Sequence, residues 1–286
     1  MDTRSGQIRS NTYQKVTQFK DSTSDFTKID VDSLNIIFKN YEDIIPEIKN
    51  ENIDVPILAT LNNVNQNDIL SLNENDEDKA FSLGICNENM NLFMSLISII
   101  KNEELIRGTD ESKTDTFVNY LFRIIEYDKY PLMFELKTTC KFEVGNKFIT
   151  SEFDFGVKRK KTVLLLDEDK HFKNTGRSKA WGEYQIAGEI LAAAVNNYNN
   201  SIDNPTIFAV RVIGTRFTFY RSCVPNDYLF SLSEGFPDKC FEIARYPSQL
   251  NDKELSGFLD FKKCEERKII LNILAKIRKY ILINLN

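Results

Sequence analysis

Apolar residues recur along the chain with two different periods, which divide it into helical and extended segments. Spacings of three and four residues predict helices over residues 30–48, 87–105, 109–127, 178–196 and 259–283. Alternation with a period of two predicts strands over residues 134–144, 147–157, 206–213 and 216–221. The dipeptide Gly145-Asn146 separates the first two of these strands, so we expect them to form a β-hairpin.

One further strand, over residues 162–170, is apolar on both parities from Val163 to Leu166, which is typical of a strand buried on both faces. It ends in four charged residues, Asp167-Glu168-Asp169-Lys170. Because successive side chains of a strand point to opposite faces, Glu168 and Lys170 should share one face and Asp167 and Asp169 the other. We expect the second pair to be structural.

From residue 109 onward the predicted order is helix, three strands, helix, two strands. That order predicts an α/β sandwich with a mixed sheet. We expect four parts: a polar, disordered lead over 1–25, a helical N-terminal region over 26–108, the α/β core over 109–225, and a C-terminal helical extension over 226–286. Within the second part, residues 49–80 are Asn- and Asp-rich and predict a loop.

Composition excludes several classes of protein. The 42% hydrophobic content, with 21 Phe and 11 Tyr, is enough for a packed core. No apolar run reaches the ~18 residues of a membrane helix, and no N-terminal signal sequence stands out, so we expect an intracellular protein of the nucleus or cytoplasm with no membrane partner. The five cysteines form no CxxC pair and the chain has a single histidine, His171, so the sequence predicts neither a zinc site nor a disulfide framework.

The net charge of −5 hides a strong local imbalance. Between residues 158 and 179 eight basic residues face three acids, so that window carries +5 and the rest of the chain −10. A basic patch of this kind is typical of contacts to a polyanionic backbone. The candidate nucleic-acid-binding residues outside the strand are Lys158, Arg159, Lys160, Lys161, Lys173, Arg177 and Lys179.

Acids and a lysine converge beside this patch in the predicted arrangement. Asp154 closes the second hairpin strand, Glu168 and Lys170 close the buried strand, and Glu111 lies on the apolar face of the helix over 109–127. Mg²⁺ or Mn²⁺ takes oxygen ligands and keeps several waters, so two or three carboxylates suffice. A neighbouring lysine can orient or deprotonate an attacking water, or stabilise charge on a phosphate. Glu111 could equally be an ordinary acid in a first helical turn.

The residues resemble a known family pattern. Asp154, thirteen further residues and then Glu168-Asp169-Lys170 at the end of an apolar strand is similar to the PD-(D/E)XK nuclease superfamily, over roughly residues 110–221. The resemblance implies a restriction-endonuclease-like core, with Asp154 and Glu168 as metal ligands and Lys170 as the catalytic lysine. It further implies Glu111 as the acid from the first core helix and Gln185 as the polar residue of the following helix. The region also resembles the nuclease-like modules of crinkler-type effectors and of selfish elements.

Two positions in the pattern have rivals, and one departs from it. Glu126 competes with Glu111 on the same helix, and Asp167 competes with Glu168. Phe153 stands where the family often has proline. These departures leave the exact ligand set open.

The resemblance implies a Mg²⁺-dependent endonuclease that hydrolyses phosphodiester bonds of nucleic acid, DNA more than RNA. The alternative is a catalytically inactive module on the same fold that binds nucleic acid or a protein partner. The sequence leaves the oligomeric state open, a homodimer included.

Overall fold

The computed structural model of the chain describes residues 19–49, 64–73, 75–104, 110–170, 177–249 and 256–284. Its strands are β1 (Ile36–Asn40), β2 (Met133–Val144), β3 (Lys147–Arg159), β4 (Thr162–Lys170), β5 (Thr206–Ile213), β6 (Arg216–Cys223), β7 (Phe241–Tyr246) and β8 (Leu259–Asp260). Its α-helices are α2 (Lys28–Ser33), α4 (Gln66–Ser71), α5 (Glu77–Ser82), α6 (Asn87–Glu104), α7 (Ser112–Ile124), α8 (Glu183–Asn199), α9 (Asn226–Ser231) and α10 (Cys264–Ile283). Short 3₁₀ turns are η1 (Thr23–Asp25), η4 (Arg177–Gly182) and η5 (Leu232–Glu234).

The eight strands form one open, mixed sheet in the order β1-β7-β6-β5-β4-β3-β2, with β8 paired to β6. Two pairs are parallel, β1 with β7 and β4 with β5, and the other pairs are antiparallel. Parallel neighbours need a crossover, and α8 supplies the one between β4 and β5. The predicted α/β class with a mixed sheet is therefore confirmed.

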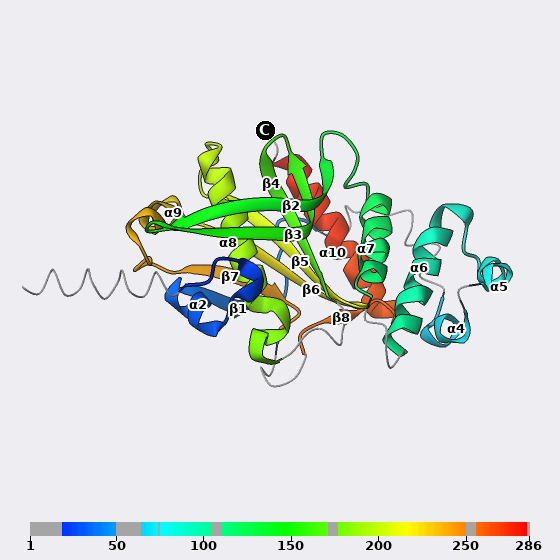
Figure 1. Cartoon of the computed structure of the whole chain (residues 1–286). Helices are drawn as coiled ribbons and strands as arrows, with labels where there is room; N and C mark the ends of the chain where they lie inside the picture. The colour runs from blue at the N-terminus through cyan, green and yellow to red at the C-terminus, as the bar shows by residue number, and fades with distance from the viewer. Residues whose placement is uncertain are drawn as a thin grey trace, which may run out of the picture.

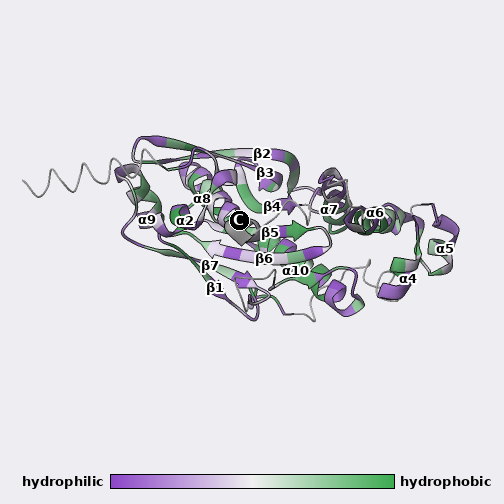
Figure 2. Ribbon diagram, turned by 60° about the horizontal axis from the view of Figure 1, so that its bottom comes forward, coloured by the Kyte–Doolittle hydropathy of each residue, from purple (hydrophilic) through white to green (hydrophobic). Residues whose placement is uncertain are grey.

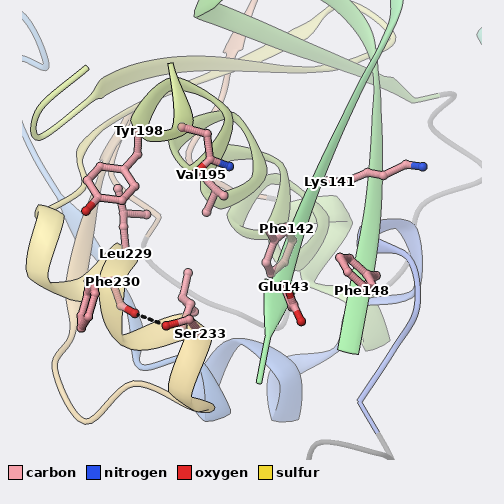
Figure 3. A pocket seen from close by; sticks show the side chains of 11 residues that line it. Lys141, Phe142, Glu143, Phe148, Val195, Tyr198, Leu229, Phe230 and Ser233 are labelled. Carbon is pink, nitrogen blue, oxygen red and sulfur yellow. Dashed lines mark hydrogen bonds between the residues drawn. The ribbon is translucent and has the colours of Figure 1, made fainter. Parts of the chain in front are cut away.

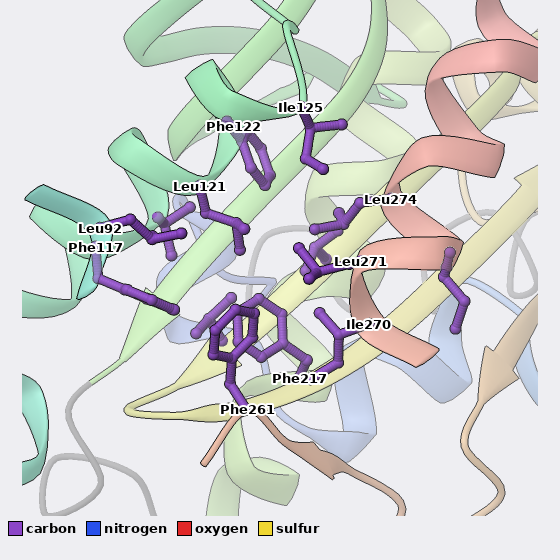
Figure 4. Packing of buried hydrophobic residues seen from close by; sticks show 14 of the residues in the cluster. Leu92, Phe117, Leu121, Phe122, Ile125, Phe217, Phe261, Ile270, Leu271 and Leu274 are labelled. Carbon is purple, nitrogen blue, oxygen red and sulfur yellow. The ribbon is translucent and has the colours of Figure 1, made fainter. Parts of the chain in front are cut away.

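Helices cover both faces of the sheet, so two hydrophobic cores form. The face covered by α8 contacts η1, α2 and α9 as well. The opposite face packs against α7 and α10, where Phe117 of α7, Phe217 of β6 and Phe261 meet with ring centroids 5.1–6.2 Å apart (Figure 4). Each of these rings is fully buried and contributes about 1.5–3 kcal/mol through its removal from water. Helices α4, α5 and α6 lie at one end of the molecule, opposite α9 (Figures 1 and 2).

The central predictions agree closely with the structure. Strands β4 and β5 have the predicted bounds and the β2–β3 hairpin forms. The ends of α6, α7, α8, β6 and α10 each lie within five residues of their predicted positions. All five cysteines are free thiols, as expected.

The predictions were wrong in the N-terminal and C-terminal parts. The helix expected over 30–48 is instead the short helix α2 followed by strand β1, which pairs with β7. The C-terminal extension also contributes β7 and β8 to the sheet, so it is not purely helical. In the expected loop over 49–80, residues 66–71 and 77–82 are helical, and residues 50–63 lie outside the described chain.

The expected disordered lead is also wrong for residues 19–25, whereas residues 1–18 lie outside the described chain. Phe19 and Phe26 are buried and pack edge to face, with centroids 5.2 Å apart. Thr150 of β3 donates its backbone N–H to the carbonyl of Asp21. This segment closes the core over α8.

The N-terminal segment packs most closely against α8 at Gly188. A Cβ at Gly188 would lie 2.7 Å from Thr23 Cγ2 and 2.8 Å from Phe26 Cε2. Gly188→Ala should therefore lower the free energy of unfolding by about 1–3 kcal/mol through overpacking, although alanine is the better helix former. Urea unfolding measures it, and Asn199→Ala, at an exposed position of α8, should change stability by less than about 0.5 kcal/mol. A Gly188→Ala protein as stable as the wild type would contradict this packing.

Candidate active site

Strand β3 separates from β4 just before the charged end of β4. The last residue pair between the two strands is Phe155 with Asp167. Beyond it Asp154 continues the contact with its side chain, because its Oδ2 accepts a hydrogen bond of 2.8 Å from the backbone N–H of Asp169. The other oxygen, Oδ1, is in an ion pair with Nζ of Lys137 from β2. Asp154 is therefore fixed at the fork between the strands, with both oxygens occupied.

Three of the predicted site residues meet on the face of β4 that α8 covers. Glu168 is 2% exposed and forms an ion pair with Nζ of Lys170. Nε2 of Gln185, in the first turn of α8, donates a hydrogen bond of 2.5 Å to Oε1 of Glu168. The predicted sharing of one face by Glu168 and Lys170 is thus observed, and Gln185 joins them.

The turn before α8 is built to hold Gln185 in place. Ala180, Trp181 and Gly182 all have positive φ, of 46°, 57° and 92°. The fully buried guanidinium of Arg211 donates from Nη1 to the carbonyls of Ala180, at 3.3 Å, and Trp181, at 3.1 Å. Arg211 stands beside Glu168 in the register of β5 with β4, so the strand that flanks the site also anchors the start of α8.

Burial and crowding of like charges dominate the electrostatics. Burial raises the pKa of Glu168 from 4.5 to about 7. The ammonium of Lys170 opposes this rise, and the charge of Asp154 adds to it. Burial by itself disfavours the charged form of Lys170, but the carboxylates of Glu168 and Asp154 offset it and raise the pKa of that lysine. The result is an acid-rich cluster in which the partly exposed ammonium of Lys170 is paired with Glu168.

Asp167 and Asp169 point to the opposite face, as predicted, but they are far more buried than a solvated strand end would be. They are 0% and 1% exposed. Burial, and for Asp169 also the charge of Asp167, raises the pKa of both carboxyl groups. Their carboxylate oxygens receive no hydrogen bond from the groups that the structure describes. The raised pKa favours the neutral form of both groups, so Asp167 and Asp169 form a pair of buried carboxyl groups beneath the site.

Helix α7 brings an acid to the site, although a different one stands closest to Asp154. Glu111 is the N-cap of α7, and its charge acts on Lys170 and Asp115. Asp115, one turn later, is half-buried, and burial together with the charge of Asp154 raises its pKa from 3.8 to about 6. The rival residue Glu126 is bound elsewhere, because its Oε2 pairs with Arg278 of α10 at 2.9 Å.

Sequence reasoning therefore missed three residues of the site: Asp115, Lys137 and Glu189. Glu189 is fully buried on α8, and its Oε1 accepts a hydrogen bond of 2.8 Å from Gln185. Asp115 and Glu189 each lie four residues after a predicted site residue on the same helix, and residues at that spacing share a helix face. The spacing was the available signal. No comparable pattern marks Lys137.

The carboxylate oxygens at this site are the type of ligand that a hard cation such as Mg²⁺ prefers. Within the described ranges no three Asp, Glu, His or Cys side chains are arranged so that they could hold a metal ion together. Mg²⁺ does not require such a cage, because it keeps several waters and is bound through one or two carboxylates. Oε2 of Glu168 and Oε2 of Glu189 are buried acceptors without a hydrogen bond from any described group. Such oxygens are costly to bury unless positive charge reaches them.

The candidate basic residues whose side chains the structure describes lie apart from this site. Lys158 pairs with Glu135, Arg159 is the last residue of β3, and Lys160 and Lys161 form the turn between β3 and β4. Seven residues of extended strand, about 23 Å, separate Lys161 from Glu168. Lys173 and His171 lie outside the described chain, as do the side chains of Arg177 and Lys179. The basic turn and the acid cluster are thus at opposite ends of β4.

A separate pocket of about 350 Å³ opens between the β2–β3 hairpin, the end of α8 and α9. Phe142, Phe148, Tyr198 and Phe230 line it (Figure 3). Gln185 and Tyr198 are thirteen residues apart on α8, about 20 Å along the axis. The pocket therefore lies outside the site at β4.

No family model matches this chain, and no curated protein matches its sequence. In the part of the chain that the structure describes, no helix combines the length and apolar character needed to cross a membrane.

Proposed function

We propose that the protein is a metal-dependent nuclease with a restriction-endonuclease-like core of the PD-(D/E)XK type. The observation that carries the proposal is the contact of Glu168 with both Lys170 and Gln185, beside Asp154 at the fork of β3 and β4. The order α7, β2, β3, β4, α8, β5, β6 supports it, because it reproduces the order that the resemblance implies.

The residues have separate roles in this proposal. Asp154 and Glu168 present carboxylate oxygens to Mg²⁺ or Mn²⁺, and Gln185 orients Glu168 through its amide. Lys170, whose ammonium is already paired with Glu168, neutralises charge that develops on the scissile phosphate. When bound, the cation supplies Lewis-acid polarisation of the phosphate oxygens. The exposed basic turn of Lys160 and Lys161 contacts the nucleic-acid backbone, DNA in preference to RNA.

A second function, a catalytically inactive module that binds nucleic acid or a protein partner, is favoured by the state of Asp154. Both of its oxygens are occupied, one by the ammonium of Lys137 and one by the N–H of Asp169. Lys137 would have to release Oδ1 before Asp154 could bind a cation. Salt-sensitive binding of nucleic acid without cleavage is the signature of this alternative.

Cleavage assays separate the two functions. Purified protein should cut plasmid DNA or single-stranded DNA with Mg²⁺ or Mn²⁺ and not with EDTA, and Asp154→Asn should lower the rate about 10²-fold or more. Product analysis by gel measures the rate, and Glu152→Gln, an exposed position two residues away, should cut like the wild type. Equal cleavage by wild type and Asp154→Asn, or none by either on DNA and RNA, would eliminate the nuclease function.

A further inference from the structure

Glu189 is a charged side chain in a place where sequence patterning gives no reason for one. It lies in the middle of α8, between Gly188 and Ile190, and is 0% exposed. Among the described residues no Lys or Arg forms a salt bridge with it, and the side-chain amide of Gln185 donates a hydrogen bond to its Oε1. Its Oε2 is buried without a hydrogen bond from any described group, which is costly, and a bound cation would offset that cost.

Gln185 joins this glutamate to Glu168. The single nitrogen Nε2 of Gln185 donates to Oε1 of Glu168 at 2.5 Å and to Oε1 of Glu189 at 2.8 Å. The charge of Glu168 acts on Glu189, because the two carboxyl groups lie close together. One amide thus fixes one oxygen of each carboxylate and leaves Oε2 of each buried without a donor among the described groups.

Asp154 presents the opposite situation, because both of its oxygens are already engaged. Glu168 and Glu189 each keep one oxygen without a hydrogen bond from a described group, whereas Asp154 would first have to release Lys137. Two carboxylate oxygens suffice for Mg²⁺ or Mn²⁺, which fill the other positions with water or phosphate oxygens.

We infer that Glu189 is a metal ligand of this chain, paired with Glu168 through Gln185 to bind one divalent cation. The inference rests on the proposed function and deepens it, because the Asp154–Glu168–Lys170 pattern contains no residue of α8 that ligates the metal. It also gives Gln185 a definite task, which is to hold two carboxylates in register and not to touch the phosphate.

Glu189→Gln is the appropriate variant because it keeps the shape of the side chain and removes the charge. If Glu189 is only a packing residue, the amide should be tolerated or should stabilise the core, since a buried charge disappears. If Glu189 is a ligand, the affinity for a cation must fall whether or not the protein is turning over substrate.

The experiment is a calorimetric titration of the full chain with Mn²⁺ alone. Glu189→Gln should weaken binding at least about tenfold, Glu168→Gln should abolish it, and Glu152→Gln should leave it unchanged. Glu189→Asp keeps the carboxyl group on a side chain one methylene shorter and should give an intermediate affinity. Circular dichroism checks the fold of each variant.

The outcomes distinguish the two levels of the proposal. If Mn²⁺ binds to the wild type, is lost in Glu168→Gln and is unchanged in both Glu189 variants, the ligand assignment is overturned and the nuclease proposal stands. If the folded wild type binds no Mn²⁺ at all, both are overturned.

Discussion

Lys170→Ala is expected to lower the rate of Mg²⁺-dependent cleavage about 10²–10³-fold, the usual cost of removing a group that stabilises charge in the transition state. The ammonium of Lys170 is held at the end of β4 by its ion pair with Glu168. Among the residues that the structure describes, no second lysine is paired with Glu168, and Lys137 is paired with Asp154. Single-turnover rates at saturating enzyme measure the effect on the chemical step.

Two variants control for the structural consequences of losing Lys170. Lys170→Ala leaves Glu168 buried without its cation, and breaking a buried pair costs about 3–5 kcal/mol, so its thermal unfolding must be measured alongside. Lys170→Arg keeps the charge and should retain the fold with part of the activity. Lys161→Ala, in the exposed turn at the other end of β4, should weaken nucleic-acid binding with little change in the rate of the bound complex. A Lys170→Ala protein that is folded and cuts within a few-fold of the wild type would refute the role of this lysine.

The sequence predicted the part of the fold where periodicity and pairing agree. Strand β4 was predicted to the residue because Val163–Leu166 are apolar on both parities, which a strand covered on both faces requires. The hairpin followed from alternation on both sides of Gly145, whose φ of 61° suits the turn. These are local signals that the tertiary structure did not override.

The failure at residues 30–48 has a tertiary cause. Leu34, Ile37, Phe38 and Tyr41 fit a helical spacing, yet Ile37 and Tyr41 are 42% and 43% exposed in the structure. Asn35 has φ of 50° and ends the helical part, after which β1 pairs with β7, about two hundred residues away. A partner at that distance leaves no trace in a single sequence, and pairing context decides strand formation.

At the site, the sequence predicted which way the side chains point but not how deeply they are buried. Alternation correctly assigned Glu168 and Lys170 to one face and Asp167 to the other, because direction depends only on strand geometry. Burial depends on what covers each face. Helices pack on both sides of β4, so Asp167 has no access to water although its position in the sequence resembles a solvated strand end. Glu189 was missed for a related reason: an acidic residue in a mostly apolar helix is ordinarily assigned to the solvent-exposed side, and only the packing shows that it is buried.

The metal-free protein is expected to lose stability as the pH rises from about 5 to about 8.5. The pKa of Glu168 is raised from 4.5 to about 7, chiefly by burial, so the folded state holds a proton that the unfolded chain releases. The stability that this proton contributes is complete below pH 4.5 and is lost as the pH rises through about 7. That rise of the pKa corresponds to about 3 kcal/mol, a large fraction of the 5–15 kcal/mol of an average domain.

Asp167, Asp169 and Glu189 act in the same direction, because burial raises the pKa of each of them. The decline should therefore continue above pH 7, and a cation bound by Glu168 and Glu189 should reverse it by mass action. Urea unfolding in EDTA at several pH values measures the slope. Glu168→Gln has no carboxyl proton to lose, so the total loss of stability over this pH range should be smaller by about 3 kcal/mol. Glu152→Gln, on the exposed face of β3, should show the same loss as the wild type. If wild type and Glu168→Gln show the same pH dependence in EDTA, the pKa of Glu168 is not raised in the folded protein, contrary to what its burial beside Asp154 and Glu189 implies.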